Sequence, residues 1–241
     1  MSARRVLVIA HRGASAVAPE STEAALRAAV RARVPMIELD VQMTRDGRLV
    51  VFHDDRLERT TDGRGRLTQM RYAQIARLDA GRWFRPRFAG QRILLVSQVF
   101  RRVPSHVRLN LELKRTPHRT ALVRRLVRLI RRSGARRRLL CSSFDPRLLP
   151  PLRQAGLPIA LLCRADPDRS LARAVRLGCR AWHAVHTVVT PVRVRRAHAA
   201  GLAVHVWTVE DIRLARRLIR WGADGIFTND PARLTRRLGL R

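Results

Sequence analysis

Residues 107–142, VRLNLELKRTPHRTALVRRLVRLIRRSGARRRLLCS, contain two apolar runs separated by a longer amphipathic segment. The runs Val107–Leu113 and Leu139–Ser142 have the length and composition of buried strands. Between them, apolar residues from Val123 to Ile130 recur at a spacing of three and four, which predicts a helix with one buried stripe. A strand, a helix and a second strand in this order indicate a βαβ unit with parallel strands.

The same alternation continues along the whole chain and yields nine candidate strands. They are Val6–Ala10, Met36–Val41, Leu49–Phe52, Val107–Leu113, Leu139–Ser142, Ile159–Cys163, Ala181–His183, Ala203–Trp207 and Gly225–Thr228. We therefore predict an α/β fold in which residues 1–241 form a single domain, a (β/α)8 TIM-type barrel. Such a barrel needs one strand fewer, and we expect the short Ala181–His183 segment to be the surplus one.

The region around the third predicted strand departs from the regular pattern. Between Val41 and Leu49 the chain is too short for a crossover helix, so we expect the barrel to be irregular there. Residues 54–98 contain several glycines and a proline that mark turns. We predict that they form a short insertion after the third strand, near enough to line a substrate mouth.

The predicted helices carry apolar residues on one side and arginines on the other. In Val123–Ile130 and in Ala215–Ile219 the arginines fall outside the apolar stripe, so we expect them to coat an outer ring of helices. A first helix is expected at Glu23–Arg33, with Ser21 as its N-cap.

Charge is the unusual feature of the composition. The chain has 50 basic and 18 acidic residues, a formal net charge of +32, and among the basic residues only Lys114 is a lysine. Such a surface attracts polyanions, so contact with an anionic membrane surface is a candidate interaction. An arginine bias that merely solvates the outer helix faces explains the charge equally well. The absence of a clustered basic and aromatic motif argues against a nucleic-acid partner.

The three cysteines are odd in number and far apart. Cys141, Cys163 and Cys179 lack metal-ligand or redox spacing, so we interpret them as reduced core residues of a cytoplasmic protein. The apolar run Val6–Ala10 is too short for a signal peptide or a membrane span, so it is interpreted as a buried strand. Any membrane contact is therefore expected to be peripheral.

The first four predicted strands each carry charged or histidine side chains at, or just past, their C-terminal end. In chain order these are His11 and Arg12, Glu38 and Asp40, His53 and Asp54, and Glu112 and Lys114. In a barrel the C-terminal strand ends converge on one face, where active sites lie. Three carboxylates offer the hard oxygen ligands that Ca²⁺ or Mg²⁺ prefers, and two histidines can act as acid and base.

Two counts support a functional interpretation of this cluster. Glu38 and Glu112 are two of only six glutamates, and both lie inside apolar strands, where an unpaired carboxylate is costly. The only lysine, Lys114, lies at the same rim, which suggests that a compact charge is required there. Alternatively, Lys114 simply neutralises Glu112 or Glu38.

Nine motifs occur in the order in which the glycerophosphodiester phosphodiesterase family has them. They are His11-Arg12-Gly13, Pro19-Glu20-Ser21-Thr22, Glu38-Leu39-Asp40-Val41, Asp46-Gly47 with Val50-Val51-Phe52-His53-Asp54, Thr60-Thr61-Asp62-Gly63, Asn110-Leu111-Glu112-Leu113-Lys114, Ser143-Phe144, Trp207-Thr208-Val209 and Asp224-Gly225-Ile226-Phe227-Thr228. From about residue 9 to residue 232 the chain resembles this family, which belongs to the barrel superfamily that includes phosphatidylinositol-specific phospholipase C.

The resemblance implies both a reaction and a set of residue roles. The reaction is the metal-dependent hydrolysis of a glycerophosphodiester, such as glycerophosphocholine, to glycerol 3-phosphate and an alcohol. The implied roles are a Ca²⁺ or Mg²⁺ site at Glu38, Asp40 and Glu112, an acid–base pair at His11 and His53, phosphate contacts from Arg12 and Lys114, and a pocket lined by Phe144 and Trp207. The sequence leaves open which histidine is the acid, whether water or the neighbouring glycerol hydroxyl attacks, and the oligomeric state.

The chain departs from the family pattern at four places. Ser21 and Glu210 each replace an asparagine, Asn229 replaces an aspartate, and Leu94-Leu95-Val96-Ser97-Gln98 replaces Pro-Thr-Leu-Glu-Glu. These changes concern the headgroup end of the site more than the reaction. The net charge and the apolar stretch Ile93–Val96 motivate an alternative, lysophospholipase D-type activity on membrane lysophospholipids. A barrel that binds polyanions or membranes without catalysis is the other alternative.

Overall fold

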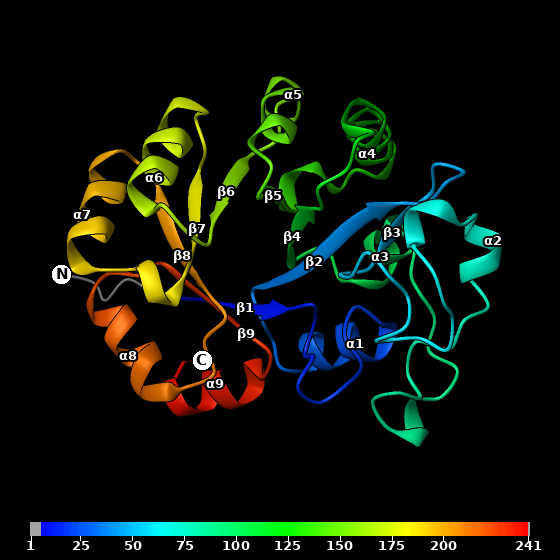
Figure 1. The fold of residues 1–241 in the computed structure, drawn as a ribbon. Helices are drawn as coiled ribbons and strands as arrows, with labels where there is room; N and C mark the ends of the chain where they lie inside the picture. Colours follow the sequence, from blue (N-terminus) through cyan, green and yellow to red (C-terminus); the bar gives the residue numbers. More distant parts are fainter. Residues whose placement is uncertain (1–5, 241) are drawn as a thin grey trace.

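In this computed structural model, which describes residues 6–240, eight parallel strands close into a barrel because β1 pairs with both β2 and β9 (Figure 1). Around the ring the order is β1-β2-β4-β5-β6-β7-β8-β9. The barrel strands are β1 Leu7–His11, β2 Met36–Met43, β4 Arg108–Leu113, β5 Leu139–Ser143, β6 Ile159–Cys163, β7 Ala181–Val185, β8 Ala203–Trp207 and β9 Gly225–Thr228. The predicted (β/α)8 barrel is confirmed.

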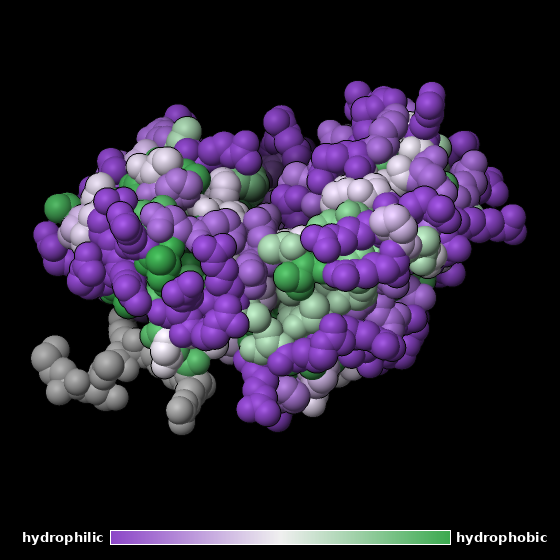
Figure 2. All heavy atoms as spheres, turned by 90° about the horizontal axis from the view of Figure 1, so that it is seen from below, coloured by the Kyte–Doolittle hydropathy of each residue, from purple (hydrophilic) through white to green (hydrophobic). Residues whose placement is uncertain are grey.

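Helices surround the barrel and cover the outer face of its sheet (Figure 1). They are α1 Glu23–Arg31, α3 Val96–Arg102, α4 Arg119–Ser133, α5 Leu149–Gln154, α6 Pro167–Arg176, α7 Pro191–Ala199, α8 Ile212–Arg220 and α9 Pro231–Leu238, with the short α2 Tyr72–Ile75 beyond β3. In α4 the residues Leu122, Leu126 and Ile130 are buried, while Arg124 and Arg128 are exposed. Hydrophilic side chains cover most of the face seen in Figure 2, as expected for arginines on an outer helical ring.

The surplus strand is β3, Leu49–Val51, and not the Ala181 segment, so that expectation was wrong. β7 lies in the ring between β6 and β8. β3 pairs with β2 in the antiparallel direction, through a turn in which the amide of Thr44 donates to the carbonyl of Arg48 at 2.9 Å. Antiparallel neighbours need only a short connection, which explains why the chain between Val41 and Leu49 has no helix.

The direction of β3 also decides where His53 lies. A parallel third strand was expected to bring His53 to the mouth at its C-terminal end, as the other strands do. Instead β3 starts beyond the end of β2 and runs back, and the amide of Phe52 donates to the carbonyl of Asp40 at 3.0 Å. His53 therefore reaches the rim from outside the barrel ring.

The first helix is two residues shorter at its C-terminus than expected, and Thr22 caps it in place of Ser21. The hydroxyl of Thr22 accepts a hydrogen bond from the amide of Ala25 at 3.5 Å. Ser21 instead has a φ of 60°, in the left-handed region that asparagine adopts more readily than most residues. The backbone at this position therefore suits the asparagine that the family usually has.

Residues of β3 and of the segment that follows it form a small second core, in agreement with the predicted insertion. It contains Val50, Phe52, Leu57, Leu67, Ile75, Ala80 and Ile93, and within it lie the 3-10 turns Leu67–Gln69 and Pro86–Phe88. Ile93, Leu94 and Val96 are buried. The apolar stretch is therefore part of the interior, which removes one of the two reasons for the membrane-lipid alternative.

The structure also bears on the predictions about the cysteines and about membrane-spanning helices. Cys141, Cys163 and Cys179 are free and buried, as expected. Across residues 6–240, the helices are all too short or too polar to cross a lipid bilayer.

Candidate active site

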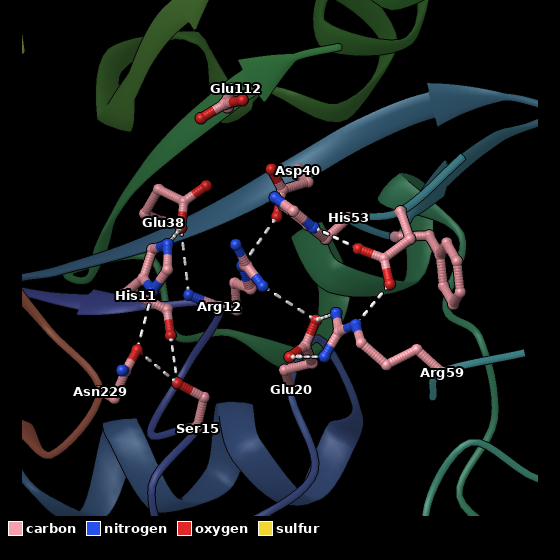
Figure 3. Close-up of polar contacts among 12 residues, drawn as sticks. His11, Arg12, Ser15, Glu20, Glu38, Asp40, His53, Arg59, Glu112 and Asn229 are labelled. Carbon is pink, nitrogen blue, oxygen red and sulfur yellow. Dashed lines mark hydrogen bonds and ion pairs between the residues drawn. The ribbon is translucent and has the colours of Figure 1, made fainter. Parts of the chain in front are cut away.

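Three buried carboxylates lie side by side at one end of the barrel (Figure 3). Glu38 and Asp40 point the same way from β2, and the register of β2 and β4 places Asp40 opposite Glu112. The exposed fractions of Glu38, Asp40 and Glu112 are 2%, 1% and 9%. One oxygen from each carboxylate lies within 4.8 Å of the others. The predicted metal ligands are thus brought together.

Two cations contact these carboxylates. The guanidinium Nε of Arg12 lies 3.3 Å from Oδ2 of Asp40, and the Arg12 amide donates to Oε2 of Glu38 at 3.1 Å. Nζ of Lys114 donates to Oδ1 of Asp40 at 3.2 Å and to Oε1 of Glu112 at 2.9 Å. Lys114 therefore bridges Asp40 and Glu112 and does not contact Glu38. Three formal negative charges face two positive ones.

The pKa values of the acids follow from this imbalance. Burial raises the pKa of Glu112 to about 7, with a further contribution from the charge of Asp40. Burial and the charges of Asp40 and Glu112 raise the pKa of Glu38 well above its usual range. Burial also acts to raise the pKa of Asp40, but the adjacent Lys114 and Arg12 outweigh it and lower that pKa. The cluster therefore favours a further positive charge.

The carboxylate oxygens of the cluster fit a hard divalent cation. Among the described residues, Oε1 of Glu38 is buried and accepts no hydrogen bond, and Oδ2 of Asp40 has only the ion-pair contact with Arg12. Buried polar atoms without a partner are rare and call for an explanation. Two oxygens bound to one Ca²⁺ lie at most about 5 Å apart, so the spacing of the three carboxylates matches one shared ion.

His11, at the end of β1, is fixed on one side by Asn229. Its Nδ1 lies 2.8 Å from Oδ1 of Asn229, which also accepts a hydrogen bond from the Ser15 hydroxyl at 2.9 Å. Because an amide oxygen only accepts, Nδ1 carries the proton, and Nε2 faces the site 3.9 Å from Oε2 of Glu38. Burial, with a contribution from the charge of Arg12, lowers the pKa of His11 to about 4. His11 is therefore a neutral imidazole with a free acceptor nitrogen.

His53 lies on the other side of the carboxylates and has a carboxylate partner of its own. Its Nδ1 lies 2.5 Å from Oδ1 of Asp54, and Arg59 binds the other oxygen of Asp54. Burial lowers the pKa of His53, while the charge of Asp40 and the hydrogen bond to Asp54 act in the opposite direction. Of the two histidines, only His53 has a carboxylate hydrogen-bonded to its ring.

A chain of charged contacts joins Arg12 to His53 (Figure 3). Glu20 accepts from Arg12 at 3.1 Å and from two nitrogens of Arg59 at 3.0 and 2.6 Å. Arg59 in turn holds Asp54 beside His53. The network fixes the two basic groups of the rim relative to each other.

Aromatic residues line the opposite side of the mouth. Phe144 follows β5 and Trp207 ends β8, and their rings meet edge to face with centroids 5.6 Å apart. The indole nitrogen of Trp207 donates to the carbonyl of His183 at 3.1 Å, which fixes the ring. Arg164, directly after β6, places its guanidinium carbon 5.6 Å from each ring centroid.

Comparison with models of protein families matches residues 11–233 to the glycerophosphoryl diester phosphodiesterase family. The chain belongs to this family. It is accordingly a phosphoric diester hydrolase of the glycerophosphodiester type.

Individual relatives agree over almost their whole length. The chain is 34% identical to a glycerophosphodiester phosphodiesterase of Caldanaerobacter subterraneus over 95% of this chain and 96% of the relative. It is 30% identical to a glycerophosphodiester phosphodiesterase of Bacillus subtilis over 96% and 86% of the two chains. An Oleispira antarctica phosphodiesterase, solved in complex with the product sn-glycerol-3-phosphate, superimposes with a TM-score of 0.93 at 30% identity, covering 98% of this chain and 97% of that one.

In this phosphodiesterase the structure brings together His11, Arg12, Glu38, Asp40, His53, Glu112 and Lys114 as the sequence predicted. Sequence reasoning missed the contacts made by Glu20, Arg59 and Arg164. Glu20 lies in a motif that was recognised, so the motif itself was a signal for it. Nothing in the sequence distinguishes Arg59 or Arg164, because each is one arginine among 49.

Proposed function

We propose that this chain hydrolyses glycerophosphodiesters with the help of one Ca²⁺ or Mg²⁺ ion held by Glu38, Asp40 and Glu112. The observation that carries the proposal is the buried cluster of three carboxylates, in which Oε1 of Glu38 accepts no hydrogen bond and Lys114 does not contact Glu38. Such a site offers few protein ligands and leaves room for water and a substrate phosphate. When bound, the ion would neutralise negative charge on the phosphoryl oxygens.

Arg12 and Lys114 would bind the phosphate beside this site. Both side chains are held by the acids, through Asp40 for Arg12 and through Asp40 and Glu112 for Lys114, and both are partly exposed at the mouth. Charges fixed in this way need no reorganisation when negative charge develops on the phosphoryl group, which is the main source of electrostatic catalysis.

The hydrogen bonds of the two histidines favour different roles. Nε2 of His11 is an acceptor, because Asn229 holds the proton on Nδ1, so His11 suits the base. It would take the proton of the attacking oxygen as that oxygen bonds to phosphorus. His53, supported by Asp54, suits the acid. It would give its proton to the oxygen of the leaving alcohol as the P–O bond breaks.

The attacking oxygen belongs either to water or to the neighbouring glycerol hydroxyl. Attack by water yields glycerol 3-phosphate directly. Attack by the glycerol hydroxyl first yields a five-membered cyclic phosphate, which water then opens. Quenched single-turnover reactions analysed by ³¹P NMR would separate the two paths, because only the second shows a cyclic phosphate before glycerol 3-phosphate.

The proposed function is tested with purified protein and a set of glycerophosphodiesters whose alcohols are choline, glycerol and inositol. We expect release of glycerol 3-phosphate with Ca²⁺ or Mg²⁺, and its loss after chelation and in His11→Ala. Arg128→Gln, a change on the exposed face of α4, should react like the parent chain. Turnover that persists at an undiminished rate in chelator would refute the metal assignment.

A further inference from the structure

The mouth of the barrel has two chemically different halves. β1, β2 and β4 are neighbours in the ring and carry His11, the carboxylates and Lys114. β5, β6 and β8 belong to the other side, and at their C-terminal ends lie Phe144, Arg164 and Trp207. Since Ser142 of β5 is in register with Glu112 of β4, the aromatic half begins directly beside the carboxylates. A substrate phosphate held at the acidic half would extend its alcohol over Phe144, Arg164 and Trp207.

Two aromatic rings at an edge-to-face angle of 90° form the kind of surface that binds a quaternary ammonium group by cation–π attraction. In this chain a cation of the protein itself, the guanidinium of Arg164, already lies at that surface. The guanidinium of Arg164 lies 5.6 Å from the centroids of both Phe144 and Trp207, within the range of a cation–π contact. A trimethylammonium group would have to displace a permanent positive charge in order to use the same rings.

The charge of Arg164 is not neutralised by a neighbouring acid. Within residues 6–240 it has no carboxylate at ion-pair distance. Two acids close to Phe144 or Arg164 in the sequence have other partners. Asp145 forms ion pairs with Arg119 and Arg147, and Asp166 accepts a hydrogen bond from the backbone amide of Arg169 as the N-cap of α6. The side chain of Arg164 is exposed, so its donors are available to a ligand.

Further arginines surround the same place. A cavity of about 410 Å³ beside Phe144 and Arg164 is also lined by Arg169 and Arg173, with Asp166 as its acid. A second cavity of about 510 Å³, which also borders Phe144, is lined by Arg115, Arg147 and Arg173, with Asp145 as its acid. Three arginines against one aspartate line each cavity, so the surroundings of Phe144 carry an excess of positive charge.

We propose that Arg164 is a specificity-determining residue that selects substrates by the charge of the leaving alcohol. It favours alcohols that carry an anionic group, such as a second phosphate, and disfavours quaternary ammonium alcohols such as choline. A guanidinium binds phosphate oxygens through paired N–H donors and repels an ammonium at the same distance. This inference rests on the proposed hydrolysis of glycerophosphodiesters, of which it names the substrate class.

The test compares kcat/KM for three substrates that differ in the leaving alcohol: glycerophosphocholine, glycerophosphoinositol and glycerophosphoinositol 4-phosphate. We expect the phosphorylated alcohol to react fastest and choline slowest. Arg164→Gln should reduce the ratio of the anionic to the cationic substrate by roughly tenfold, because it removes an attraction for one and a repulsion for the other. The rate with neutral glycerophosphoinositol should change little.

Two further variants identify the cause of such a change. Arg164→Lys keeps the charge and should keep the order of the three substrates. Arg128→Gln removes the same charge from the outer face of α4 and should leave all three rates unchanged. A ratio that Arg164→Gln does not alter, or an equal fall for all three substrates, overturns the inference while leaving the proposed hydrolysis standing. Failure of the parent chain to hydrolyse any of the three refutes the proposed function itself.

Discussion

Nδ1 of His11 and Oδ1 of Asn229 lie 2.8 Å apart although 218 residues separate them in the chain. The contact crosses the seam where β1 pairs with β9 and the barrel closes. It fixes the tautomer of His11, and therefore decides which ring nitrogen faces the carboxylates. Asn229 is also one of the positions at which the chain departs from its family.

Removing this hydrogen bond should impair catalysis without preventing metal binding. In Asn229→Ala, Nδ1 of His11 loses its acceptor, and the ring is free to turn or to change tautomer. We expect kcat to fall roughly tenfold or more, as is usual when the partner that orients a reacting histidine is lost. Steady-state kinetics and calorimetric titration with Ca²⁺ check this. Unchanged kcat in Asn229→Ala would show that Asn229 does not position His11.

Glu210 and Asn229, two residues at which the chain departs from its family, contact each other. We expect each change to offset the effect of the other on stability. Glu210 accepts hydrogen bonds from the backbone amide of Asn229 at 2.7 Å and from the hydroxyl of Thr228 at 3.0 Å. Restoring the aspartate of the family in Asn229→Asp would place a second carboxylate next to Glu210, so we expect a lower melting temperature. Adding Glu210→Asn should recover it. A double-mutant cycle should give a coupling of about 1 kcal/mol, typical of contacting residues, and additive effects would contradict the idea.

Glu38→Gln should separate metal binding from folding. It removes a buried charge that Lys114 does not contact, so the fold should persist, whereas a divalent ion loses one anionic ligand. We expect Ca²⁺ or Mg²⁺ to raise the melting temperature of the parent chain but not of the variant. Activity should fall by roughly a hundredfold or more. The exposed Glu58→Gln is the matched control and should keep both responses.

The lysine at position 114 should not be replaceable by arginine. Nζ of Lys114 fits between two carboxylates, with donor distances of 3.2 Å to Asp40 and 2.9 Å to Glu112. The planar guanidinium of Lys114→Arg is larger and would push these acids apart. We expect kcat/KM to fall about tenfold or more at an unchanged net charge. The reverse exchange on the outer surface, Arg128→Lys, should have no effect, and equal activity of Lys114→Arg would show that charge alone suffices.

The buried histidine His205, inside the barrel, should contribute a loss of stability as the pH falls from about 6.5 to about 4. His205 stacks on His183 with ring centroids 4.9 Å apart, and burial lowers the pKa of His205 to about 4. In the unfolded chain the side chain of His205 binds a proton below about pH 6.5, whereas in the folded protein it does so only below about pH 4. The free energy of unfolding therefore decreases as the pH falls through that window. At pH 5 the loss amounts to about 2 kcal/mol for this group.

Denaturant unfolding at pH 7 and pH 5 measures this loss. His205→Gln should show a smaller decrease between the two pH values, whereas replacement of the exposed His106 by Gln should leave the decrease as it is. Burial also lowers the pKa of His183, so part of the effect should survive in His205→Gln. An equal decrease in both variants would show that His205 is not the group responsible.

The amino-acid sequence alone determined most of the elements and which charged and histidine side chains gather at the rim. The spacing of apolar residues is a local property, so the strands and the buried stripe of α4 could be predicted from it. The carboxylates at Glu38, Asp40 and Glu112 follow from the same pattern, because side chains two apart on a strand share a face and parallel strands end at one rim.

Only the tertiary structure decided how those groups are held. Nothing local distinguishes an antiparallel β3 outside the ring from a barrel strand, so sequence reasoning chose the wrong surplus segment at Ala181. The contact of His11 with Asn229 depends on ring closure, and the place of Arg164 over Phe144 and Trp207 depends on the packing of three strand ends. The packing of the elements sets the contacts between residues that are far apart in the chain. The spacing of apolar residues within one helix or strand does not show which other elements it packs against.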